Sequence, residues 1–145
     1  MAVRATREIV FDASPEAILD ALADIEEVPS WSTLHRHTEV LDRHSDGRPH
    51  HVKATVRIMG VTDRELLEYH WGPDWVVWDA MDTFQQRGQH GEYNLTRIGD
   101  QTMVRFDIIV DVAAPIPEFL VKRAKRMILD VAVDRLRCRV TRNHG

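Results

Sequence analysis

The stretch Pro115–Val140 reads PIPEFLVKRAKRMILDVAVDRLRCRV and has the clearest helical periodicity of the chain. Its apolar residues recur at steps of three and four, the spacing of one buried helix face. These residues are Leu120, Ala124, Met127, Ile128 and Val131. Pro117 suits a first helical turn, where its missing N–H leaves no bond unmade, and Glu118 suits the positive end of the helix dipole. We predict one long C-terminal helix, with a curved sheet of earlier residues closing around it.

Length and composition indicate one soluble domain spanning residues 1–145. The chain has 145 residues, of which 43% are hydrophobic and 29% charged, as in globular proteins. Its apolar runs fall short of the roughly 18–20 residues that a membrane span needs, and its N-terminus alternates instead of forming the apolar core of a signal peptide. The single cysteine, Cys138, excludes an internal disulfide. We therefore expect a cytoplasmic protein without a transmembrane segment.

The N-terminal part predicts a strand followed by two short helical segments. Residues Val3–Phe11 alternate as a strand does. Ser14-Pro15-Glu16 then combines a hydroxyl N-cap, a proline at the first helical position and an acid in the first turn. Val28-Pro29 should end this helix, because a residue that precedes proline avoids the helical region. A short second helix or turn is expected at residues 29–31.

From Leu34 onward the apolar period changes from the helical value to the value of two that is typical of strands. The predicted strands cover residues 34–43, 52–58, 62–71, 75–80, 84–98 and 102–112. Short turns such as Met59-Gly60 and Gly99-Asp100 favour antiparallel neighbours. The fold class is therefore α+β: a curved antiparallel sheet of about seven strands, two short helices after the first strand, and a long C-terminal helix.

Several short motifs, taken in order, resemble those of a known superfamily. They are Asp12–Glu16, Val28–Trp31, the run from Tyr69 to Trp78, Gly91–Leu95, Gly99–Thr102 and Pro117. Together they resemble the START/Bet v 1-like (SRPBCC) superfamily, and within it the bacterial polyketide cyclase/dehydrase and lipid-transport group. The resemblance covers essentially the whole chain and implies the helix-grip fold. A shared fold does not by itself specify a function.

The resemblance also implies a cavity for an apolar ligand, roofed by the terminal helix. A physical reason supports this, because a strongly curved sheet and a single helix cannot be in contact everywhere. Strand alternation places Leu95 and most of the predicted ligand-binding residues on the concave face, and the helix adds Ile128 and further residues. The predicted ligand-binding residues are Trp31, Val56, Ile58, Leu67, Tyr69, Trp78, Tyr93, Phe106, Ile108, Phe119, Leu120, Met127 and Val131. The alternative is that the same residues form an ordinary packed core.

The sequence shows no pattern that assigns catalysis, a metal or a cofactor. Candidate acid–base groups are Asp79, Glu92, His90, Glu68 and Arg105. Alternation turns His90 and Glu92 outward, unless a bulge at Gly88 or Gly91 shifts the phase of that strand. The histidines lack a recognisable metal-ligand spacing, and His50 and His51 should point to opposite faces of a strand. We therefore predict no catalytic residue, no metal and no cofactor.

Three hypotheses for function remain open. The first is binding or carriage of a hydrophobic small molecule such as a lipid, isoprenoid or polyketide, by a monomer or homodimer. The second is a polyketide cyclase or dehydratase, which needs an acid or base inside the cavity. The third is an interaction module, since residues 116–145 hold eight basic and three acidic residues in a chain of net charge −4. That helix could dock transiently on an acidic surface or membrane, but its basic residues lack interleaved aromatics for specific nucleic-acid recognition.

Overall fold

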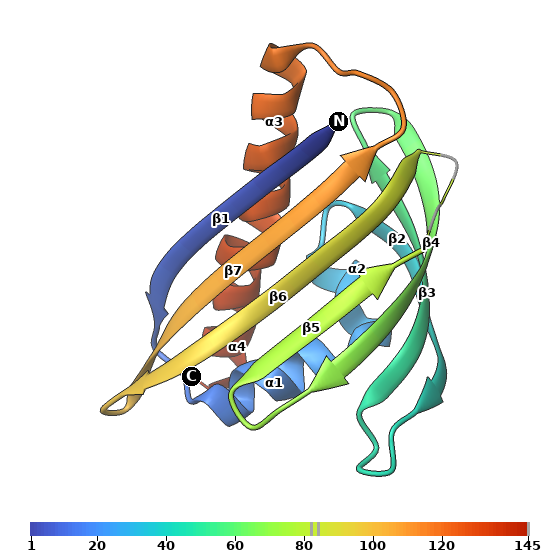
Figure 1. Ribbon diagram of the computed structural model, residues 1–145. Helices are drawn as coiled ribbons and strands as arrows, with labels where there is room; N and C mark the ends of the chain where they lie inside the picture. Colours follow the sequence, from blue (N-terminus) through green and yellow to red (C-terminus); the bar gives the residue numbers. More distant parts are fainter. Residues whose placement is uncertain (82, 84, 145) are drawn as a thin grey trace.

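In the computed structural model, which describes residues 1–81, 83 and 85–144, a seven-stranded antiparallel sheet curves around a long C-terminal helical segment (Figure 1). The strand order is β1-β7-β6-β5-β4-β3-β2. The strands are β1 (Ala2–Phe11), β2 (His35–Arg43), β3 (Pro49–Ile58), β4 (Val61–Trp71), β5 (Trp75–Ala80), β6 (Gln86–Ile98) and β7 (Gln101–Val112). This arrangement confirms the predicted α+β helix-grip fold. No described helix is long and apolar enough to cross a membrane.

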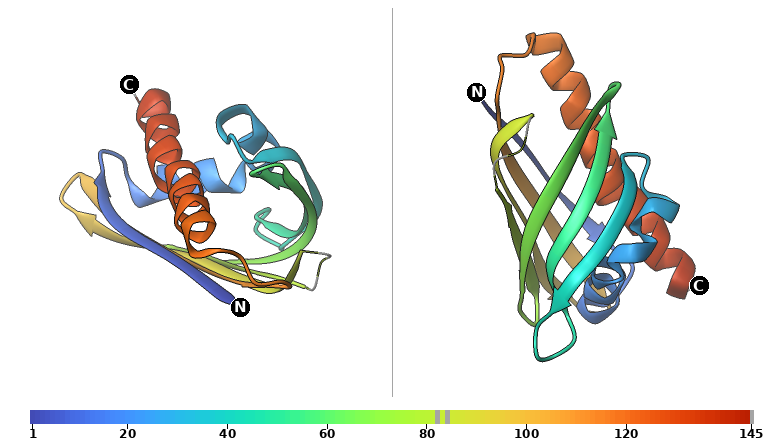
Figure 2. Two further views of the ribbon diagram at one scale, coloured as in Figure 1. Left: turned by 90° about the horizontal axis from the view of Figure 1, so that it is seen from above. Right: turned by 90° about the vertical axis from the view of Figure 1, so that its right-hand side faces the viewer.

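Two short helices follow β1, as predicted, but the first ends at Ala23 and not at Val28-Pro29, and Val28 is itself helical. Ser14 caps α1 (Pro15–Ala23), because its Oγ accepts a hydrogen bond of 3.1 Å from the main-chain N–H of Ala17. A 3₁₀ turn at Ile25–Glu27 (η1) then leads into α2 (Val28–Trp31). Helix α1 contacts the C-terminal helical segment and β6, while η1 and α2 contact β2. The short helices therefore bridge the edge of the sheet and the last helix (Figure 2).

The C-terminal segment consists of α3 (Glu118–Leu129), a π-helical stretch at Asp130–Arg135 and α4 (Leu136–His144). Helix α3 has no buried residue, although three of the predicted apolar residues, Leu120, Ala124 and Ile128, face inward. The segment that follows is packed: Val133, Leu136 and Val140 are at most 1% exposed. The apolar face that was predicted to be buried along its whole length is therefore only partly buried in α3 and becomes fully buried in the segment after it.

The π-helical stretch separates these two halves and is tied to the sheet. A π-turn contains one more residue than an α-turn, so it rotates the following side chains relative to the preceding ones. This rotation is why a strict helical period did not predict Val133 as part of the packed face. The Tyr93 hydroxyl in β6 donates a hydrogen bond of 2.7 Å to the main-chain carbonyl of Ala132. The helix is therefore held to the sheet at the boundary between its two halves.

The main hydrophobic core lies below α3, where α1, β1, β7 and α4 meet. Its most deeply buried members are Phe11, Ile18, Val104 and Leu136, all 0% exposed. Interiors packed in this way lose stability when a side chain is truncated, because the lost contacts and the new void both cost free energy.

We expect the two halves of the last helix to respond differently to the same truncation. Leu136→Ala should lower the free energy of unfolding by about 3–4 kcal/mol, as in other buried leucine truncations. Leu120→Ala should lower it by about 1 kcal/mol or less, because Leu120 is only partly buried. Urea denaturation of both variants measures the difference. Equal losses would mean that α3 is packed core.

Candidate functional site

A cavity of about 680 Å³ lies between the concave face of the sheet and α3. Its lining comes mainly from the inward residues of β3 to β7, from α3, and from the β7–α3 connection. Residues of β1, the short helices, the start of β2 and the π-helical stretch complete it. Most of these residues are apolar, and the helix contributes Leu120, Val121, Ala124 and Ile128. Figure 2 shows how the curved sheet and the helix enclose this region from opposite sides.

The structure brings eleven of the thirteen predicted ligand-binding residues to this cavity. They are Trp31, Val56, Ile58, Leu67, Tyr69, Trp78, Tyr93, Phe106, Ile108, Leu120 and Val131. Phe119 is instead 70% exposed, and Met127 is half-buried and lies outside the lining. Leu95, predicted on the concave face, belongs to the packed core below the cavity. Residues spaced by three and four cover a helix face that is wider than the strip bordering the cavity. Met127 lies on that face but outside the strip.

Aromatic rings form one continuous wall of the cavity. Trp78 lies between Tyr69 and Tyr93, with ring centroids 5.6 and 5.8 Å away, and Tyr93 is 4.9 Å from Phe106. The wall depends on Gly91, since a Cβ there would lie 2.1 Å from the Trp78 indole. The glycine that the sequence marked as a bulge or a close approach is therefore a close approach.

A polar cluster that was not predicted from the sequence interrupts the apolar lining. Its centre is Glu65 of β4, whose Oε2 accepts hydrogen bonds of 2.7 Å from Gln86 Nε2 and 2.9 Å from Gln89 Nε2. Gln86 Nε2 also contacts Asp63 Oδ2 at 3.0 Å, and Trp78 Nε1 donates to Gln89 Oε1 at 3.0 Å. The signal for Glu65 was present, because the alternation that turns Leu67 and Tyr69 inward also turns Glu65 inward.

Burial makes Glu65 an unusual carboxyl group. The residue is only 8% exposed, and desolvation raises its pKa to about 7, against the opposing effect of the hydrogen bonds from Gln86 and Gln89. The negative charge of Asp63 raises that pKa further. Among the described residues, neither Glu65 Oε1 nor the Tyr69 hydroxyl has a hydrogen-bond partner. The cavity therefore offers a carboxyl group that can hold or release a proton near neutral pH.

His35 is a second titratable group in the lining. Ser32 Oγ accepts hydrogen bonds from the main-chain N–H groups of Leu34 and His35, and it lies 2.7 Å from His35 Nδ1. The serine hydroxyl therefore donates to that ring nitrogen. Desolvation lowers the pKa of His35 to about 4, so the ring is neutral at physiological pH.

The pairing of β6 with β7 shows which of its side chains face the cavity, a point that depended on whether Gly88 or Gly91 forms a bulge. The strand has one irregularity, between Gln86 and Gly88, and continues in regular register from there to Ile98. His90 therefore faces away from the cavity, where it contacts Asp79 at 2.7 Å and Glu92 at 3.1 Å. None of the five acid–base candidates chosen from the sequence lines the cavity. The bulge has a different effect, because it turns Gln86 inward to Glu65.

Comparison with known proteins places the chain in a family. A model of the family described as polyketide cyclase / dehydrase and lipid transport matches residues 2–141, so the chain belongs to that family. This confirms the resemblance predicted from the sequence motifs. A search of curated proteins found no sequence match.

Solved structures with low sequence identity share the fold. A START superfamily protein from Mycobacterium smegmatis has a TM-score of 0.85 at 22% identity, over 97% of this chain and 98% of the other. A Thermus thermophilus protein has a TM-score of 0.81 at 18% identity, over 98% and 99% of the two chains. The Zhui aromatase/cyclase of a Streptomyces species has a TM-score of 0.79 at 11% identity, over 100% and 97%.

The raised pKa of Glu65 predicts a specific pH dependence of stability. Between its ordinary pKa of 4.5 and about 7, the folded protein keeps a proton that the unfolded chain releases. Stability relative to Glu65→Gln should therefore fall as pH rises through this range, by on the order of 3 kcal/mol in total.

Urea unfolding of both proteins at pH 4.5 and pH 8 measures this difference. Subtracting the variant cancels the contributions of the histidines and other shared groups. A difference in unfolding free energy that stays constant with pH would show that folding does not raise the pKa of Glu65.

Proposed function

We propose that this member of the polyketide cyclase/dehydrase and lipid-transport family binds and carries a hydrophobic small molecule in the cavity under α3. The observation that supports this most strongly is the cavity itself, about 680 Å³ and lined mainly by apolar and aromatic side chains. Binding sites for small organic ligands range over roughly 300–1,000 Å³ and have this composition. A lipid, an isoprenoid or a polyketide-like molecule fits that description.

The exposure of α3 supports the same function. Its inward apolar residues, among them Leu120, Ala124 and Ile128, remain partly accessible because they border the cavity. A ligand in the cavity would remove this surface from water, at roughly 25 cal/mol for each Å² buried. The helix that periodicity predicted to be buried would then be buried by its ligand.

The polar cluster supports a ligand with one polar end. Glu65 Oε1 and the Tyr69 hydroxyl lie on the same inward face of β4, and neither has a hydrogen-bond partner within the part of the chain that the structure describes. A protonated Glu65 can donate to a ligand carbonyl, and an ionised one can accept from a ligand hydroxyl. The proposed ligand therefore has an apolar body and a hydroxyl or carbonyl group at one end.

Filling the cavity from the helix should weaken binding without unfolding the protein. Ala124→Phe adds a large side chain to the lining, and we expect at least about 10-fold weaker binding of an apolar fluorescent probe. The melting temperature should change little, because the void accommodates the ring. Arg123→Phe is the matched control, since Arg123 is exposed on the same helix.

Two results would contradict the proposal. One is a wild-type protein that takes up no apolar probe. The other is an Ala124→Phe variant that binds the probe as well as the control does, which would locate binding outside the cavity.

A second candidate function is that of a cyclase or dehydratase, and Glu65 is the observation that favours it. General acid–base catalysis needs a group with a pKa near the working pH at the reacting atoms. Glu65 has a pKa of about 7 and borders the cavity, which none of the sequence-derived candidates does. In this role it would transfer a proton to or from a bound polyketide-like substrate.

Incubation with a poly-β-ketone substrate mimic separates the two functions. We expect a carrier to return the compound with its mass and chromatographic retention time unchanged, as read by liquid chromatography and mass spectrometry after extraction. Water loss or ring closure in the wild type, abolished in Glu65→Gln while binding persists, would instead establish the enzyme.

A further inference from the structure

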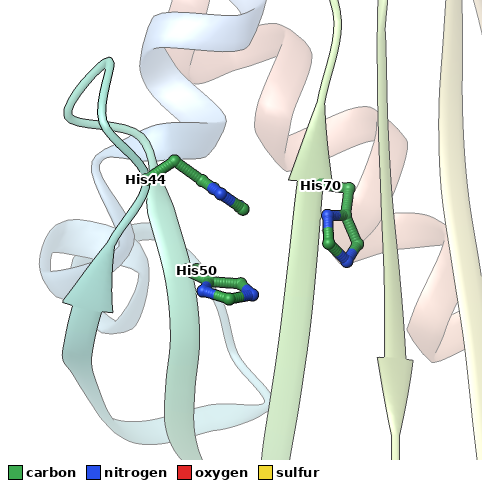
Figure 3. Close-up of side chains that lie close together, drawn as sticks. All are labelled: His44, His50 and His70. Carbon is green, nitrogen blue, oxygen red and sulfur yellow. The ribbon is translucent and has the colours of Figure 1, made fainter.

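Outside the cavity, three histidines gather on neighbouring segments of the sheet. His44 follows β2, His50 lies in β3 and His70 lies in β4, and Figure 3 shows their side chains close together. The ring centroid of His44 is 4.2 Å from that of His50 and 5.4 Å from that of His70. One ring nitrogen from each residue lies within 4.8 Å of the other two. None of the three residues lines the cavity.

An irregularity in the β2–β3 pairing brings His50 into this group. Asp42 pairs with His51 and Arg43 pairs with Pro49, so His50 is an extra residue between the two pairs. A bulge of this kind redirects a side chain, and the rings of His50 and His51 lie 3.9 Å apart. The expectation that these two side chains point to opposite faces was therefore wrong. It assumed regular alternation through the bulge.

The groups around the three histidines resemble the outer shell of a metal site. The Nε2–H of His44 donates to the main-chain carbonyl of Tyr69 at 2.7 Å, because that oxygen can only accept. His70 Nε2 lies 2.9 Å from Glu68 Oε1. Hydrogen bonds of this type fix the tautomer of a ligating histidine and leave its other ring nitrogen unprotonated.

Two carboxylates adjoin the cluster and supply negative charge. His50 lies 3.6 Å from Asp42 and 3.8 Å from Glu68. Asp42, His50 and His51 form a second group whose ligand atoms also lie within 4.8 Å of one another. His50 thus belongs to both candidate groups, and the two acids would offset the charge of a divalent cation.

We propose that His44, His50 and His70 bind one divalent first-row transition-metal ion, independently of the ligand cavity. Imidazole nitrogens suit Zn²⁺, Ni²⁺ and Cu²⁺, whereas Mg²⁺ and Ca²⁺ prefer oxygen ligands. Three histidines leave the fourth position of a tetrahedral ion for water. The bound ion would connect the β2–β3 turn to β4. The sequence spacing could not indicate this site, because its ligands come from separate segments.

Zinc titration of chelator-treated protein, purified without a polyhistidine tag, tests the proposal. Isothermal titration calorimetry should give one saturable Zn²⁺ per chain, with a higher melting temperature in zinc. His50→Ala should lose this binding, and His37→Ala should keep it, because His37 is an exposed β2 histidine outside both groups. Glu68→Gln should weaken binding roughly 10–100-fold, as loss of an outer-shell partner does.

Further variants decide which residues hold the ion. Loss of binding in His44→Ala and His70→Ala supports the proposed triad, and circular dichroism without metal shows that each variant is folded. Loss in His51→Ala with binding retained in His70→Ala would overturn the assignment in favour of the group containing Asp42. Absence of saturable binding in the wild type, or wild-type affinity in His50→Ala, would overturn the site itself.

Discussion

The structure depends on a mismatch between a strongly curved seven-stranded sheet and the single helix that it surrounds. One helix can fill such a sheet at one level only. It does so where Leu136 and Val140 meet the core around Phe11 and Ile18. Further toward α3 the two surfaces diverge, and the remaining space is the cavity. The part of the helix around Leu136 and Val140 therefore packs in the core, and α3 borders the cavity.

The same geometry determines the chemistry of the cavity. Glu65 lies on the concave face, where the sheet and α3 exclude most water from it, so its proton is retained to a pH near 7. Gln86 and Gln89 both donate to Oε2, and Oε1 has no hydrogen-bond partner among the described residues. A group held in this way can orient a polar ligand end or exchange a proton with it. Both proposed functions, carrier and enzyme, would use Glu65. They would differ in whether the molecule bound in the cavity can react with its proton.

The fold and most of the cavity wall could be predicted from the sequence, because local periodicity carries that information. Alternation correctly turned Val56, Tyr69 and Phe106 toward the helix, and the same rule would have found Glu65 had it been applied to polar residues. The orientation of Gln86 and His50 could not be predicted in this way. Both depend on bulges, and a bulge is a property of how two strands pair, which neither strand specifies alone.

The hydrogen bond between Tyr93 and Ala132 has a consequence for selectivity. It fastens the helix at the π-helical boundary, while beyond it α3 contacts mainly β1 and none of its residues is buried. A change in the tilt of α3 would therefore alter the height of the roof without disturbing the core. Under the proposed function, the same protein would accommodate ligands of different girth, whereas the fixed position of Glu65 would make the location of the polar end the stricter requirement.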